Sequence, residues 1–165
     1  MKMKTMMKTM MKNSHIYRIS IILAVIIFHS YGYAGNSISV RGAWIMAAPP
    51  NARVIAGYMT IENRSSDSRI LVNVTSSHFK RIEIHRTINQ GDMMKMVPRR
   101  TLEIPARGKV LLQPGSYHLM LIGPETVPRE GEDVKLSLLF DNGLTLDIQV
   151  PVLSAINSSM MRSPH

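Results

Sequence analysis

The chain has 165 residues, of which 45% are hydrophobic and 19% are charged, and it contains no cysteine. This length and apolar content suit a single globular domain with a proper core. Residues 1–34 contain five Lys and Arg and no Asp or Glu, so the formal net charge of +9 for the whole chain falls to about +4 for residues 35–165. The composition excludes disulfides and thiolate metal sites and gives little support to nucleic-acid binding.

The N-terminal segment has the three-part plan of a secretory signal peptide. A basic stretch ends at Arg18, an apolar run covers 19–28, and small residues precede a cleavage position after Ala34. The alternative is a membrane anchor, but the apolar run is shorter than the roughly 20 residues that a spanning helix needs. We therefore predict export, cleavage near Ala34, and no stable membrane insertion afterwards.

The rest of the chain is divided into short strand-like runs by Gly, Pro, Asn and Asp turns. Runs of this kind, without helical periodicity, predict an all-β fold, an antiparallel sandwich or barrel. The predicted domains are a signal peptide over 1–34, a β-domain over 35–153 and a polar, mobile C-terminal tail over 154–165. The expected strands cover 37–46, 54–63, 69–75, 80–87, 93–98, 101–105, 109–113, 117–121, 133–140 and 144–152.

Four residues in the middle of the chain form a soft, uncharged set of possible metal ligands. His85 is followed by Met96 after ten residues, by His118 after twenty-one more, and by Met120 one residue on. Two imidazoles and two thioethers suit Cu(I) better than zinc, calcium or magnesium. His118 and Met120 leave the same face of a strand, with Cα atoms about 6.6 Å apart. His85 and Met96 each close a strand-like run, so the four donors converge if these strand ends meet at one rim of a sheet.

This spacing resembles the signature of the periplasmic copper chaperones called PCu(A)C, which supply the dinuclear copper site of cytochrome c oxidase. Further matching pieces keep their order as far as about Val152. Thr87 departs from the pattern, because many members carry a methionine close after the first histidine. The matching pieces are Ala43-Trp44, Ala48-Pro49-Pro50, Gly57-Tyr58-Met59-Thr60-Ile61, Met94-Lys95-Met96, Glu103-Ile104-Pro105 and Pro114-Gly115-Ser116-Tyr117-His118-Leu119-Met120.

The resemblance implies a cupredoxin-like Greek-key β-barrel that binds Cu(I) in the periplasm through His85, Met96, His118 and Met120. It implies delivery to acceptors with cysteine ligands, such as oxidase subunit II or a Sco-type chaperone, by a protein that we expect to be monomeric. Copper storage or resistance, and a metal-free β-sandwich binding module, remain open. No catalytic motif is present, and a blue-copper centre needs a cysteine, so we do not expect an enzyme.

Several other residues need an interpretation. Alternation along 93–96 places Met94 on the face of Met96, as a possible auxiliary ligand, and assigns Met93 to packing. Met59 is expected in the core and His78 on the surface. Glu83 is expected to pair with a neighbouring arginine on the strand face. In the tail, a second copper site is possible at Met160, Met161 and His165. The basic residues Arg99, Arg100 and Arg107 form either a solvated surface or a docking patch for an acidic partner.

Overall fold

The computed structural model describes residues 37–91 and 93–157. The predicted signal peptide and the three possible tail ligands lie outside the described residues. Within the described part, no helix has the length and apolar character needed to cross a membrane. Its regular secondary structure is almost entirely β, in the strands β1 (Ile38–Met46), β2 (Val54–Asn63), β3 (Arg69–Thr75), β4 (Phe79–Gln90), β5 (Met93–Arg99), β6 (Leu102–Ile104), β7 (Lys109–Leu112), β8 (Tyr117–Pro124), β9 (Asp133–Phe140) and β10 (Thr145–Leu153).

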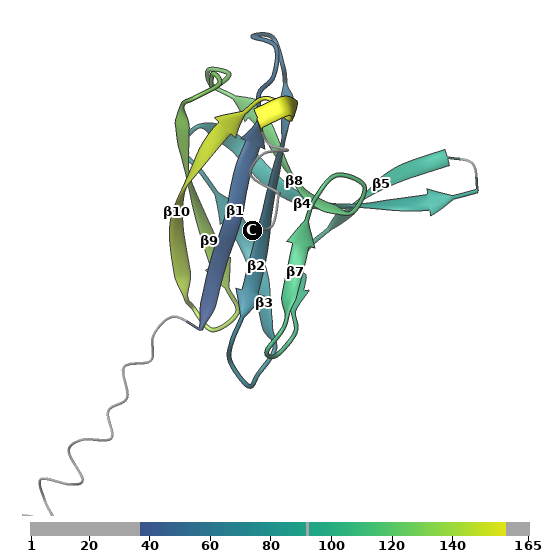
Figure 1. The fold of residues 1–165 in the computed structure, drawn as a ribbon, viewed down its shortest axis with the longest axis vertical. Helices are drawn as coiled ribbons and strands as arrows, with labels where there is room; N and C mark the ends of the chain where they lie inside the picture. The colour runs from purple at the N-terminus through teal and green to yellow at the C-terminus, as the bar shows by residue number, and fades with distance from the viewer. Residues whose placement is uncertain (1–36, 92, 158–165) are drawn as a thin grey trace, which may run out of the picture. The chain divides into compact units, whose positions relative to one another are not determined.

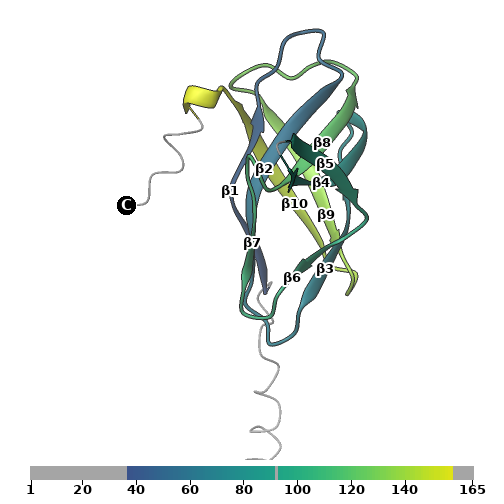
Figure 2. The ribbon, with the colours of Figure 1, turned by 90° about the vertical axis from the view of Figure 1, so that its right-hand side faces the viewer.

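The strands form two layers that share one continuous order, β5-β4-β8-β7-β2-β1-β10-β9-β3-β6. Figure 2 shows the layers from the side, with β1 and β7 in one and β3 and β9 in the other. The parallel pair of β1 and β10 joins the layers at one seam (Figure 1). The other pairings between neighbouring strands are antiparallel except for the short contact of β7 with β8. The fold class predicted from the sequence, a cupredoxin-like all-β barrel, is confirmed.

The core between the layers is aliphatic and comes from alternate residues of the strands. In β8, Leu119 and Leu121 are fully buried within it, and each such side chain contributes about 1.5–3 kcal/mol by burial. Successive side chains of a strand leave opposite faces. His118 and Met120 therefore lie on the outer face of this layer. Burial of Leu119 and Leu121 in the core thus determines that His118 and Met120 are the residues of β8 on the face of the candidate site.

Strand β4 is longer than predicted, and this moves the expected position of the site. Its pairing with β8 ends at Arg86 opposite Tyr117, but its pairing with β5 continues to Gln90 opposite Met93. Beyond the barrel the two strands form a projecting two-stranded ribbon (Figure 1). His85 consequently lies inside β4 and not at a strand end as expected, although its pair with His118 is the last but one of the β4–β8 pairing. The assignment of Met93 to packing is wrong, because its side chain is 74% exposed on this ribbon.

Gly42 has a φ of +55° and lies where the register of β1 and β2 shifts, at a β-bulge. Two local predictions are confirmed. Met59 is buried in the core, and His78 is exposed.

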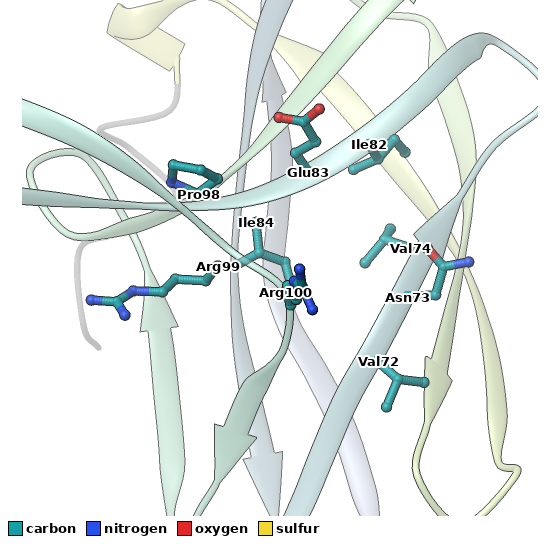
Figure 3. Close-up of a pocket in the computed structure, with 9 residues that line it drawn as sticks. All are labelled: Val72, Asn73, Val74, Ile82, Glu83, Ile84, Pro98, Arg99 and Arg100. Atoms are coloured by element: carbon teal, nitrogen blue, oxygen red, sulfur yellow. The ribbon is translucent and has the colours of Figure 1, made fainter.

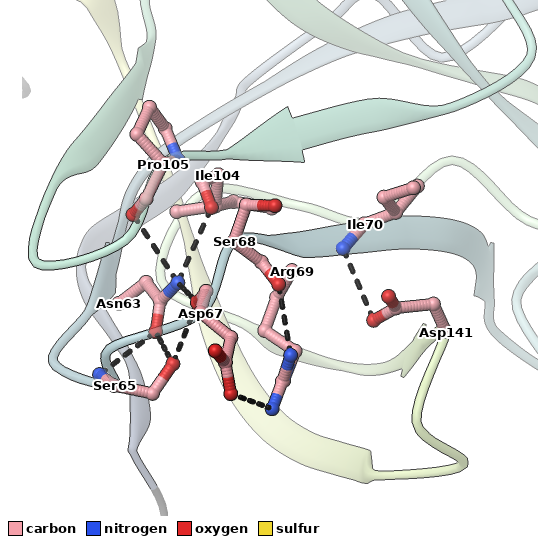
Figure 4. A network of polar contacts seen from close by, with 9 residues as sticks. All are labelled: Asn63, Ser65, Asp67, Ser68, Arg69, Ile70, Ile104, Pro105 and Asp141. Atoms are coloured by element: carbon pink, nitrogen blue, oxygen red, sulfur yellow. Dashed lines mark hydrogen bonds and ion pairs between the residues drawn. The ribbon is translucent and has the colours of Figure 1, made fainter.

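One buried polar residue ties the end of β2 to the neighbouring turns. The side chain of Asn63, 1% exposed, donates to the carbonyl oxygens of Asp67, Ile104 and Pro105 and accepts from the backbone N–H and hydroxyl of Ser65 (Figure 4). These bonds satisfy its polar atoms, as burial requires. They also hold β6 against the end of β2.

Candidate metal centre

Two histidines lie directly opposite each other on neighbouring strands. In the antiparallel pair of β4 and β8, His85 is the register partner of His118. Their ring centroids are 6.0 Å apart and the ring planes are inclined by 43°. With metal–imidazole bonds of about 2.0–2.1 Å, two rings on one ion have centroids roughly 5–6 Å apart. The pair is therefore spaced to share one metal ion.

Each imidazole has one nitrogen with a partner and one without. Nε2 of His85 lies 2.9 Å from a carboxylate oxygen of Glu83, and Nδ1 of His118 lies 3.2 Å from the carbonyl oxygen of Ser116. Nδ1 of His85 and Nε2 of His118 are buried and have no hydrogen-bond partner. Leaving a buried polar atom unsatisfied costs about 1–3 kcal/mol. Two such atoms on facing rings leave two lone pairs available to one metal ion.

Glu83 is also held on its other side. Its second carboxylate oxygen accepts a hydrogen bond of 2.8 Å from Nε of Arg81. The hydrogen bonds from His85 and then from Arg81 lower the pKa of this carboxyl group. The predicted pairing of Glu83 with an arginine on the strand face is confirmed, and the contact with His85 is additional. Alternation along the strand, which puts residues 81, 83 and 85 on one face, is the sequence signal that could have revealed it.

The two methionine ligands predicted from the sequence lie on opposite sides of this pair. Met120 follows His118 on the same face of β8 and is the register partner of Glu83. Met96 lies on β5 opposite Thr87, which is two residues beyond His85. Diagonal neighbours of this kind are about 7–8 Å apart between Cα atoms, within reach of long side chains.

The two methionines differ in exposure. Met120 is half-buried, whereas Met96 is 58% exposed on an edge strand. Met94, the possible auxiliary ligand, lies farther out on the ribbon, opposite Asn89, and is 69% exposed. The structure thus brings His85, His118 and Met120 together on two paired strands, with Met96 on the third strand and Met94 beyond it.

An aromatic pair that was not predicted as part of the site lies on the same face of the sheet. Ala56 of β2 is the register partner of Met120, so Tyr58 follows on the same side of the strand. Tyr58 packs against Trp44 of β1 with ring centroids 4.7 Å apart, and both residues are buried outside the main core. Alternation along β2 was the available signal. This pair therefore lies on the β2 side of the site, on the same face of the sheet.

A separate pocket of about 420 Å³ lies at the seam between β3 and the β4–β5 hairpin. Figure 3 shows Ile84 and Glu83 on opposite sides of β4. None of its lining residues is a histidine or a methionine. They are Val72, Asn73, Val74, Ile82, Glu83, Ile84, Pro98, Arg99 and Arg100.

Comparison with known proteins gives relatives over most of this domain. The family "LpqE-like: Putative lipoprotein LpqE-like" matches residues 38–152. The protein "Putative lipoprotein Lxx21020" of Leifsonia xyli subsp. xyli is 29% identical over 73% of this chain and 72% of its own length. An uncharacterized protein of Rickettsia prowazekii, RP573, is 34% identical over 59% of this chain. The match covers 54% of the length of that relative.

Two solved structures extend the comparison to copper-binding domains. DR1885 from Deinococcus radiodurans, solved with Cu(I), is 34% identical to this chain, with a TM-score of 0.59 over 77% of this chain and 85% of its own. The copper-bound PCuAC domain of PmoF2 has a TM-score of 0.64 at 20% identity, over 74% of this chain and 97% of its own, and supports the fold alone. On the family match and the similarity to DR1885, this chain belongs to the LpqE-like family of PCuAC-type domains.

Proposed function

We propose that this protein is an exported Cu(I) carrier that holds one ion with His85, Met96, His118 and Met120 and delivers it to acceptors with cysteine ligands. The observation that carries the proposal is the pair of facing imidazoles, each with one buried nitrogen that has no partner. Membership of the family, and the Cu(I) in the related DR1885 structure, support copper as the ion.

The chemistry of the four donors favours transport over catalysis. Neutral imidazoles and thioethers add no charge, and soft thioether sulfur selects Cu(I). Thioethers carry no proton and form no disulfides, which matters in an oxidising compartment. Thiolates bind Cu(I) more strongly than thioethers, so the free-energy gradient runs from this site to a reduced dithiol. Acid opposes binding, because a metal ligand must be a deprotonated imidazole.

The family names of lipoproteins support export of this chain, and we propose the periplasm as its compartment. Lipid attachment is not carried over from those names, because this chain has no cysteine. We propose cytochrome c oxidase subunit II or a Sco-type chaperone as the acceptor, on the grounds of their cysteine ligands and of the PCu(A)C resemblance.

The test is an anaerobic titration of Cu(I) against a chromogenic chelator. The wild-type protein should bind one ion tightly, and a variant with all four ligands replaced by alanine should bind none. A matched control removes one histidine and one methionine elsewhere, His78→Ala with Met93→Ala, both exposed in the structure. Equal and weak binding by all three proteins would refute the copper site and leave a metal-free binding module.

Delivery is separated from storage by a second measurement. The Cu(I)-loaded protein is mixed with a reduced peptide that carries two cysteines, and copper is measured in each component after separation. Transfer to the peptide without return supports a carrier. Retention of copper against an excess of the dithiol would favour storage or resistance.

A further inference from the structure

The carboxylate of Glu83 determines which nitrogen of His85 carries the proton. A carboxylate accepts hydrogen bonds and donates none, so Nε2 of His85, 2.9 Å away, must be the protonated nitrogen. In a neutral imidazole this leaves the lone pair on Nδ1, the nitrogen that is buried without a partner. The neighbouring ring has the opposite arrangement, because Nδ1–H of His118 donates a hydrogen bond to the carbonyl oxygen of Ser116 and the lone pair of Nε2 is left free.

The position of Glu83 is itself determined by its neighbours. Arg81, Glu83 and His85 alternate along one face of β4, and Arg81 donates to the carboxylate oxygen that His85 does not use. The carboxylate is therefore held between an arginine and an imidazole along the strand. The pairing of β4 with β8 sets the register of this row against His118.

We propose that Glu83, oriented by Arg81, is a positioning residue that fixes His85 as its Nε2–H tautomer and directs Cu(I) to Nδ1 of His85, while His118 binds through Nε2. This inference rests on the proposed function, because it assigns the ligating atoms of that same site. Hydrogen bonds to the non-ligating nitrogen commonly fix the tautomer and orientation of metal-binding histidines. Here the bond from Nε2 to Glu83 leaves the lone pair of Nδ1 of His85 free for the ion.

The experiment is ¹⁵N NMR of the histidine side chains, first in the metal-free protein and then with anaerobic Cu(I). The nitrogen shifts distinguish a protonated nitrogen from one with a free lone pair. We expect His85 to be protonated at Nε2 and His118 at Nδ1, and Cu(I) to shift Nδ1 of the former and Nε2 of the latter. Glu83→Ala should give a mixture of tautomers at His85 and weaken Cu(I) binding by about 10- to 100-fold.

Two further variants make the test specific. Glu83→Gln keeps one acceptor oxygen, which, directed at Nε2 of His85, should restore the wild-type tautomer and part of the affinity, while the hydrogen bond from Arg81 is lost. Glu62→Ala removes a carboxylate of β2 that pairs with Arg41 of β1 and with Arg64 and with no histidine of the described residues, and it should change neither measurement. An Nδ1–H tautomer of His85 in the wild-type protein, or an unchanged tautomer and affinity in Glu83→Ala, would overturn the proposal. Failure of the proposed function would be distinct, because the wild-type protein would then show the expected tautomers but no shift with Cu(I).

Discussion

Replacing Asn63 by alanine should destabilise the protein far more than its single polar side chain suggests. Its amide group donates to three carbonyl oxygens at 2.8, 3.2 and 3.2 Å and accepts from the N–H and hydroxyl of Ser65 at 3.0 and 2.6 Å. Two amide hydrogens and one oxygen make about four effective bonds, each contributing about 1 kcal/mol. Because the partners left behind are partly buried, we expect Asn63→Ala to lower the free energy of unfolding by about 3–5 kcal/mol.

Equilibrium unfolding in urea, followed by tryptophan fluorescence, measures this loss. Ser65→Ala is the matched control, because it removes only the hydroxyl contacts of the same network and should cost about 1 kcal/mol. Cu(I) binding by folded Asn63→Ala should be unchanged, since Asn63 lies at the opposite end of β2 from the partner of Met120. A loss below about 1 kcal/mol in Asn63→Ala would refute the estimate and show that water or neighbouring groups replace these bonds.

Three further results are expected. Free Cu(I) at about 100 times its Kd should stabilise the wild type by about 2.7 kcal/mol and raise its melting temperature. His118→Leu should abolish this rise without destabilising the metal-free protein. It removes a buried nitrogen that has no partner, and the carbonyl oxygen of Ser116 keeps the hydrogen bond from the N–H of Thr87. Gly57→Ala should cost about 1–3 kcal/mol in a denaturant titration, because a Cβ there would lie 2.9 Å from Cδ1 of Leu121; an unchanged midpoint would contradict that clash. The Lys135 hydrogen bond lowers the pKa of Asp147 below its ordinary 3.8, so Asp147→Asn should lower the melting temperature at neutral pH. This difference should vanish as the pH falls through the lowered pKa, and a difference that persists below it would refute the assignment.

Most of the strand pattern was readable from the sequence because turns and alternation agree in this chain. The predicted strands over 54–63, 69–75 and 133–140 coincide with β2, β3 and β9. The length of β4 could not be read in this way. Asn89 and Gln90 look like the start of a turn, but backbone hydrogen bonds to β5 carry the strand through them. Pairing partners outside the local sequence decide where such a strand ends.

The residues of the candidate site could be predicted from the sequence, but their arrangement in space could not. Spacing and resemblance selected the two histidines and the methionines, and alternation placed His118 and Met120 on one face. The direct opposition of His85 and His118 depends on the register of β4 with β8, which is set by core residues such as Leu119 and Leu121. Alternation along β4 allows the contact of Glu83 with His85, but the rotamers within the sheet decide whether it forms, so only the pairing with Arg81 was predicted.

The proposed ligands lie partly on central strands of the sheet and partly on the edge strand of the ribbon. His85, His118 and Met120 lie on strands that are paired on both sides, whereas Met96 lies on a strand with a single neighbour. Opening of an edge strand costs less free energy than opening of a central one. Fraying of β5 would therefore detach one donor and leave three in place. An incoming thiolate could take the vacated position on the ion, so copper could pass by stepwise ligand exchange while the barrel stays folded.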